Sequence, residues 1–112
     1  QRVEIARRSL ADIPNVEVIY DGGMLTDLFD KVGASAIVKG IRNAEDLAYE
    51  NKMAEYNFAQ NPRAVTLYVP AADALSSVSS TAVRAREDDA ERFIEYICIG
   101  ARDYVRALLS SR

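Results

Sequence analysis

Two cationic side chains lie close to a glycine in this 112-residue chain, directly after an apolar run. Lys39 and Arg42 flank Gly40 and Ile41. At the end of a strand, such cations and the backbone N–H groups can converge on a phosphate, because glycine places no Cβ in the way. Taken alone, two charges at a strand end are more often ordinary solvated charges, so the hypothesis of a phosphate-binding turn needs a second signal.

A second segment that suits anions is residues 78–84, which read Val-Ser-Ser-Thr-Ala-Val-Arg. Its three hydroxyls precede a predicted short helix through residue 86, and the amide groups at a helix start favour negative charge. Ser79 or Ser80 could equally serve only as the cap of that helix. Together, the two segments predict a site for a phosphorylated ligand.

Composition limits the classes of protein to consider. A chain of 112 residues holds one domain at most, and a formal net charge of −3 argues against a nucleic-acid binder, which would carry a basic face. The single cysteine, Cys98, falls at helical spacing with apolar residues and is expected in the core, as in a reducing compartment. Apolar runs stay well short of the ~20 residues of a membrane span, so we expect a cytoplasmic protein without membrane contact.

The hydrophobic pattern predicts the elements that would position these groups. The expected strands are residues 15–20, 34–38 and 64–69, and the expected helices are residues 2–11, 24–32, 44–60, 79–86, 90–98 and 101–109. Helix 44–60 carries Leu47, Ala48, Asn51, Ala54 and Phe58 along one side, and strand 34–38 is expected to be covered on both faces.

Strands that alternate with helices predict an α/β fold with a parallel, doubly wound sheet. Ligands of such sheets bind beyond the carboxyl ends of the strands. Residues 39–42 and 71–81 both follow predicted strands, so the sequence predicts that they share one edge of the sheet.

Five segments resemble, in order and spacing, the bacterial phosphopantetheine adenylyltransferase family. They are residues 15–19, 21–25, 37–42, 46–50 and 78–84, and the resemblance extends from residue 1 to about residue 86. It implies a Rossmann-like nucleotidyltransferase fold with a helical carboxyl-terminal end. It also implies transfer of the adenylyl group of ATP to 4′-phosphopantetheine, which gives dephospho-coenzyme A and pyrophosphate.

The chain departs from the family pattern in three ways. The family begins with a strand and a Thr…Gly-His motif whose histidine stabilises the transition state, whereas this sequence contains no histidine. The resemblance therefore implies that the amino-terminal strand and helix and the catalytic residues lie upstream, and that this chain alone has negligible activity. Lys39 stands where the family usually has arginine, and Leu75 or its neighbours replace a family aromatic residue.

The resemblance assigns ligand-binding roles residue by residue. It implies phosphopantetheine contacts from Leu25, Lys39 and Asn57. It implies ATP contacts from Gly40, Ile41, Arg42, Glu50, Leu75, Ser76, Ser77, Val78, Ser79, Ser80 and Thr81. For Asp46, a site role and a helix-dipole role are equally consistent with its place at a helix start.

Further expectations are Mg²⁺ carried by the ATP phosphates and a homo-oligomer, a hexamer by resemblance. Two alternatives remain open. One is another small-molecule nucleotidyltransferase, of the nicotinate-nucleotide or glycerol-phosphate type, because Ser-Ser-Thr-x-x-Arg is shared widely among these enzymes. The other is a non-catalytic binding or oligomerisation fragment, which the missing histidine favours.

Overall fold

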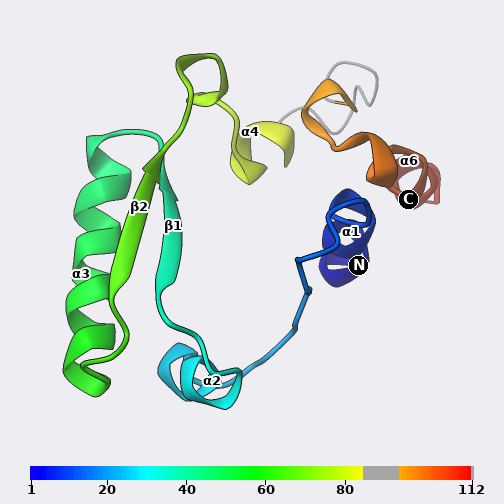
Figure 1. Ribbon diagram of the computed structural model, residues 1–112. Coiled ribbons are helices and arrows are strands. Elements are labelled where there is room, and N and C mark those ends of the chain that lie inside the picture. Colours follow the sequence, from blue (N-terminus) through cyan, green and yellow to red (C-terminus); the bar gives the residue numbers. More distant parts are fainter. Residues whose placement is uncertain (85–93, 112) are drawn as a thin grey trace. The chain divides into compact units, whose positions relative to one another are not determined.

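The computed structural model describes residues 1–84 and 94–111 (Figure 1). Its internal contacts divide the chain into two compact units, Gln1–Tyr20 with Val78–Arg112, and Asp21–Ser77. The two units are described in turn. The helices and strands are α1 Arg2–Ser9, α2 Leu25–Lys31, β1 Ile37–Ile41, α3 Ala44–Gln60, β2 Thr66–Pro70, α4 Ser80–Arg84 and α6 Arg102–Ser110, with short 3₁₀ turns η1 Asp73–Leu75, η2 Ile94–Tyr96 and η3 Ile99–Ala101.

Unit Asp21–Ser77 is built on a parallel β–α–β arrangement. β1 and β2 pair in parallel, with Ile37 opposite Thr66 and Ile41 opposite Pro70. α3 connects the two strands and runs alongside them in Figure 1. This is the parallel α/β architecture that the sequence predicts, since parallel neighbours need a helical crossover.

The strand limits differ from the predicted ones, and the difference moves part of the site. The sequence predicts strand residues 34–38, but β1 is Ile37–Ile41, so Lys39 and Gly40 lie within the strand and only Arg42 follows it. Pairing begins where the N–H of Ile37 donates to the carbonyl of Val65, at 2.8 Å. An apolar run favours a strand, but the backbone carbonyls of the neighbouring strand decide at which residue the pairing begins.

The limits of α3 are the predicted ones. The side chain of Asn43 caps its start by accepting a hydrogen bond from the N–H of Asp46, at 2.8 Å. Asn61, followed by a proline, has an extended backbone and ends it.

The side of α3 that packs agrees only in part with the predicted one: Asn51 accepts a hydrogen bond from the Tyr68 hydroxyl of β2 at 2.7 Å, and Ala54 is half-buried. Leu47 and Phe58 are exposed, whereas Asn57 is buried and Glu50 is largely covered. The sheet explains why Glu50 is covered, because β1 places Lys39 on the side that faces α3, where it pairs with Glu50. The packed side of the helix thus includes polar groups that pair with the sheet.

α2 also lies close to its predicted limits, and it packs in the same unit through Phe29, which is 3% exposed. Gly33 follows the helix with φ of +69°, the left-handed conformation that glycine adopts without strain. Asp30 connects α2 to the end of α3, because the side-chain amide of Asn61 donates to its carboxylate at 2.9 Å.

Two other predictions about strands are wrong in this structure. Asn15 lies in a turn, and residues 16–20 have no regular secondary structure and form no ladder with any described segment, although they alternate and are β-branched. Alternation favours an extended backbone, yet a strand also needs a hydrogen-bonding partner. The sheet is not covered on both faces either, since Val38, Leu67 and Val69 are more than half exposed.

In the other unit, α1 packs near η3 and α6. Ala101 and Val105 are buried there, and the guanidinium of Arg8 lies over the ring of Tyr104, 4.4 Å from its centroid. Gly100 lets the two segments approach closely, because a Cβ at this position would clash with the backbone carbonyl of Arg8. The predicted helix 101–109 is confirmed, with limits one residue later.

The remaining helical predictions in this unit need correction. Of the predicted helix 90–98, the described part contains only the 3₁₀ turn η2 Ile94–Tyr96, and residues 90–93 lie outside the described residues. Cys98 is exposed rather than buried, because the chain leaves helical geometry before it and its side chain no longer follows the apolar spacing. α4 is described to Arg84, so its predicted end at residue 86 is outside the described residues as well.

We expect Gly100→Ala to destabilise the protein by about 1–3 kcal/mol, the usual cost of adding a methyl group to a filled contact. The added Cβ would meet the backbone of α1, which cannot rotate away as a side chain could. The protein to use is the complete product of the gene that encodes this chain, called the gene product below. Unfolding it in urea measures the loss of stability. Gly40→Ala is the matched control, since its methyl group would meet nothing within 4 Å. Equal stability of the two variants would contradict the packing described here.

Candidate functional site

The sheet, α2 and α3 enclose a small cavity that collects four of the site residues predicted from the sequence. Its walls are Leu25, Ile37, Lys39, Glu50, Met53, Ala54, Asn57 and Thr66. Its volume is about 30 Å³, which gives room for one or two water molecules. Leu25, Lys39 and Asn57, the three residues that the resemblance assigns to phosphopantetheine, therefore line one site together with Glu50.

The local folding explains why these side chains meet. Successive side chains of a strand point to opposite faces, so Ile37, Lys39 and Ile41 share the side of β1 that α3 covers. Residues three and four apart share one face of a helix, which aligns Glu50, Ala54 and Asn57 along α3. The cavity is the space between these two rows.

Lys39 and Glu50 form an ion pair at this cavity. Lys39 Nζ lies 3.3 Å from Glu50 Oε2, with the side chains 40% and 16% exposed. The carboxylate is thus fixed between helix and sheet, while the ammonium group remains accessible from solvent. Such a partly exposed pair is worth little, roughly 0–1 kcal/mol, so an incoming phosphate could share the ammonium group at small cost.

Arg42 is held in a specific orientation at the end of β1. Its Nε donates to Asp46 Oδ2 at 2.8 Å, and its Nη2 donates to Asp46 Oδ1 at 3.1 Å. The backbone N–H of Arg42 also donates to Asp46 Oδ2, at 3.0 Å. The side chain of Asp46 therefore fixes both the backbone turn and the guanidinium.

The same contacts change the acid–base properties of the pair. The hydrogen bond from the Arg42 side chain, followed by the one from its backbone, lowers the pKa of the Asp46 carboxyl below its ordinary value. The hydrogen bond to Asp46 raises the pKa of Arg42. Both groups are charged at neutral pH, so the turn presents an oriented, permanently charged guanidinium.

We expect this pair to make stability depend on pH in acid. A carboxyl whose pKa is lowered by folding contributes stability above its unfolded value, near 4, and loses it as pH falls through the folded value. Asp46→Asn should therefore unfold at lower urea than the wild type at pH 7, with the difference shrinking below about pH 4. Asp103→Asn is the control, since Asp103 has a similar pair with Arg106 but is 99% exposed. A difference that stays constant down to pH 2 would contradict this role of Asp46.

Gly40 lies in β1 opposite Val69, and its position is open. A Cβ there would meet nothing within 4 Å, so packing inside the protein does not require glycine at this point. The open space leaves the backbone around residues 40–42 accessible to a ligand, as the predicted role in ATP binding needs.

The hydroxyl segment falls across the boundary between the two units. Leu75, Ser76 and Ser77 belong to unit Asp21–Ser77, where Leu75 is exposed at the end of η1. This stretch leaves the same sheet edge as Arg42, because the N–H of Ala71 donates to the carbonyl of Ile41, at 2.8 Å. The Ser76 hydroxyl donates to the carbonyl of Asp73, at 2.9 Å.

Val78, Ser79, Ser80 and Thr81 belong to the other unit, at the start of α4. Ser79 Oγ accepts a hydrogen bond from the N–H of Ala82, at 3.1 Å, so Ser79 is the helix cap. This confirms the capping alternative for Ser79, and a cap does not exclude contact with a ligand.

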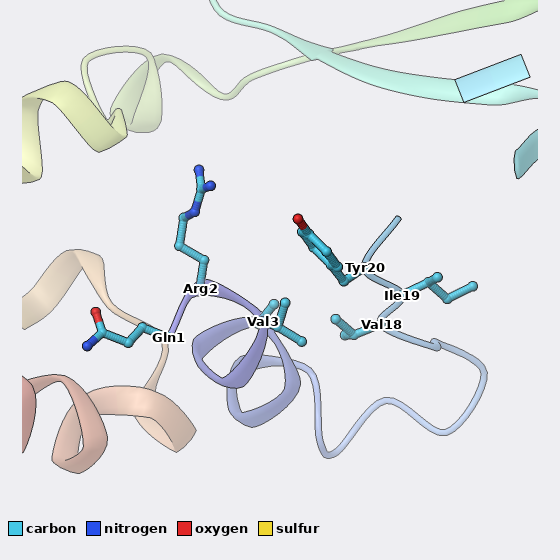
Figure 2. Close-up of a pocket in the computed structure, with 7 residues that line it drawn as sticks. Gln1, Arg2, Val3, Val18, Ile19 and Tyr20 are labelled. Atoms are coloured by element: carbon cyan, nitrogen blue, oxygen red, sulfur yellow. The ribbon is translucent and has the colours of Figure 1, made fainter. Parts of the chain in front are cut away.

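A wider hollow of about 480 Å³ lies in unit Gln1–Tyr20 with Val78–Arg112 (Figure 2). Its walls are Gln1, Arg2, Val3, Ala6, Val18, Ile19 and Tyr20. Figure 2 shows the side chains of Val3, in α1, and Val18, in the segment before α2, close to one another among these walls. None of the residues predicted to bind a ligand lines this hollow, and most of its lining is apolar, so the smaller cavity is the candidate site.

In ranges 1–84 and 94–111, no three His, Cys, Asp or Glu side chains converge as a metal site. Within those ranges, no helix has the length and apolar character to cross a membrane.

The model of the cytidylyltransferase-like family matches residues 1–86. The chain belongs to that family. Its relatives in the family include a phosphopantetheine adenylyltransferase of Caldanaerobacter subterraneus subsp. tengcongensis, 39% identical over 75% of this chain and 52% of the relative. Proteins with the same name from Staphylococcus carnosus and Actinobacillus succinogenes are 38% and 37% identical, over 75% and 74% of this chain and 52% of each relative. The chain spans about half the length of the curated relatives it matches.

Sequence reasoning missed Thr66, a polar residue of the cavity, in this member of the cytidylyltransferase-like family. Thr66 opens β2 opposite Ile37 and lines the cavity, yet it matches no motif. A signal was present, since Thr66 is the one hydroxyl in the otherwise apolar run of residues 64–67. Asp46, for which two roles were open, proves to be the partner of Arg42.

Proposed function

We propose that this chain is part of an enzyme that transfers the adenylyl group of ATP to 4′-phosphopantetheine, with dephospho-coenzyme A and pyrophosphate as products. The observation that carries the proposal is the cavity that Leu25, Lys39, Glu50 and Asn57 line together. The name of the relatives, phosphopantetheine adenylyltransferase, supports the same reaction.

The proposed reaction is an in-line displacement at the α-phosphorus of ATP. A phosphate oxygen of phosphopantetheine forms the new bond to that phosphorus, and the bond to pyrophosphate breaks. Because the attacking phosphate is already ionised at neutral pH, no strong base is needed, and the rate depends on alignment and charge neutralisation. Cations fixed at known positions are therefore what the protein must supply.

Lys39 and Arg42 supply two such cations in this proposal. Lys39 holds the phosphate of phosphopantetheine at the mouth of the cavity, with Glu50 fixing the ammonium from the helix side. Arg42, oriented by Asp46, binds a phosphate of ATP beyond the end of β1. Lysine gives a point charge where the family usually has the two-pronged guanidinium, so Lys39 orients its phosphate less strictly.

The ATP contacts of residues 75–81 also belong to the proposal. Backbone N–H groups and hydroxyls of this segment would bind the β- and γ-phosphates, in the manner that the resemblance implies. Mg²⁺ would enter with the nucleotide and neutralise charge on its phosphates. This fits the acidic residues of the site, since Glu50 and Asp46 are engaged by Lys39 and Arg42.

The proposal extends to a cytoplasmic location and a hexameric assembly, as the resemblance implies. The chain contains no histidine for the transition-state role. We therefore expect the 112-residue chain alone to have negligible activity, and catalysis to need the residues that the longer relatives carry elsewhere in their sequence.

The experiment that tests this function supplies the gene product with ATP or CTP and one acceptor, and detects products by mass spectrometry. The acceptors are phosphopantetheine, nicotinate mononucleotide and glycerol 3-phosphate. Dephospho-coenzyme A from ATP and phosphopantetheine alone supports the proposal. Product only from CTP, or only with another acceptor, would assign the chain to a different member of the cytidylyltransferase-like family. No product, with phosphopantetheine bound in a calorimetric titration, would favour a non-catalytic binding protein.

A further inference from the structure

Thr66 brings a hydroxyl to the cavity that has no protein partner. Its Oγ1 is enclosed, and among the described residues no group lies within hydrogen-bonding reach. An enclosed hydroxyl without a partner lowers stability, because it gives up its bonds to water and gains none. Such a group in a native structure calls for an explanation, and a functional role or a bound water can provide one.

The surroundings of Thr66 indicate what kind of group it could bind. Leu25, Ile37, Met53 and Ala54 form the apolar part of the wall, and the polar part consists of Lys39, Glu50, Asn57 and Thr66 itself. A hydroxyl both donates and accepts one hydrogen bond or more, and a side-chain amide does the same. The pair of Thr66 and Asn57 thus suits a neutral polar group such as an amide or a hydroxyl.

The strand register separates this position from the phosphate position. Thr66 is opposite Ile37, whereas Lys39 is opposite Tyr68, two residues further along both strands. Two residues of strand correspond to roughly 6–7 Å. A ligand whose phosphate reaches Lys39 would therefore place at Thr66 a group several bonds away from that phosphate.

We propose that Thr66 is a specificity-determining residue of this site, and that its hydroxyl binds an amide or hydroxyl group in the chain of the phosphorylated substrate. The inference rests on the proposed function, since phosphopantetheine carries a hydroxyl and amides at increasing distance from its phosphate. Before substrate binds, the cavity as a whole has room for a water molecule.

Thr66→Val distinguishes a binding hydroxyl from a structural one. The substitution keeps the shape of the side chain and removes only the hydroxyl. Because that hydroxyl has no protein partner, the thermal midpoint should stay equal or rise. Affinity for phosphopantetheine should nevertheless fall, by about three- to tenfold, as expected for one neutral hydrogen bond. A structural role would not produce these opposite changes.

The test is a calorimetric titration of three proteins with phosphopantetheine: the wild-type gene product, Thr66→Val and Thr66→Ser. The same three proteins are titrated separately with inorganic phosphate. Thr66→Ser, which keeps the hydroxyl, should retain most of the affinity. Inorganic phosphate should bind all three proteins equally, because its contact is Lys39. Thr26→Val is the control, since Thr26 is also buried but does not line the cavity.

The outcomes separate this inference from the proposed function. If Thr66→Val binds phosphopantetheine within a factor of two of the wild type, the inference is wrong and the proposed function stands. A marked fall in the thermal midpoint of Thr66→Val also overturns it, because the hydroxyl would then have a protein partner. If the wild type binds no phosphopantetheine, both fail.

Discussion

Lys39→Met is expected to weaken the binding of phosphopantetheine by roughly ten- to a hundredfold, the range for losing a hydrogen bond to a charged group. The change removes the accessible ammonium group at the cavity and leaves the side-chain volume nearly unchanged. ATP affinity should change little, since Arg42 lies beyond the strand and keeps its partner Asp46. Calorimetric titration of the gene product with each ligand measures both effects.

Two variants make this prediction specific. Lys39→Arg restores the charge and a planar donor and should bind at least as well as the wild type. Lys52→Met removes a lysine of α3 that is exposed and does not line the cavity, so it should leave the affinity unchanged. If Lys39→Met and Lys52→Met bind phosphopantetheine equally, Lys39 has no part in the site.

Arg42→Ala should have the second large effect, a loss of at least about tenfold in ATP affinity with phosphopantetheine binding retained. Arg42→Lys should recover only part of the loss, because an ammonium group cannot reproduce the two parallel bonds of the guanidinium. The gene product is titrated with ATP at fixed ionic strength.

Arg63→Ala is the matched control for Arg42→Ala. Arg63 is more exposed and lies 3.8 Å from Asp30, a pair at the other end of α3. Removing this side chain should leave the ATP affinity within a factor of two of the wild-type value. Equal losses for the two variants would mean that ATP responds to overall charge rather than to the oriented group at residue 42.

The order of elements around the site could be predicted from the sequence because several local signals agree there. The limits of α3 follow from Asn43 at its start and Asn61 with a proline at its end, and both act locally. The parallel arrangement follows from a helix of that length between two apolar runs. That the chain belongs to the cytidylyltransferase-like family agrees with this part of the interpretation.

Features that depend on distant partners could not be predicted. The apolar pattern of α3 marked Leu47 and Phe58, which are exposed, whereas Glu50 is covered because it pairs with Lys39 on the sheet. Residues 15–20 have every local property of a strand, and they lack a partner in the described part of the chain. In each case, the deciding group lies elsewhere in the sequence.

In the candidate site, too, local signals could be predicted and contacts with distant residues could not. The motif around residues 37–42 marked Lys39 and Arg42, since their types and spacing carry the chemistry. The ion pairs with Glu50 and Asp46 depend on how α3 lies against the strands, and the unpaired hydroxyl of Thr66 depends on its register opposite Ile37. Spacing along one segment carries no information about either.

The measurement that tests the central claim most directly is a crystal structure of the gene product with phosphopantetheine bound. The account predicts that the ligand phosphate contacts Lys39, and that the rest of the ligand extends along the wall formed by Asn57 and Thr66. Phosphopantetheine bound only at another place, such as the hollow beside α1, with Lys39 still paired to Glu50 and no ligand at the cavity, would contradict it.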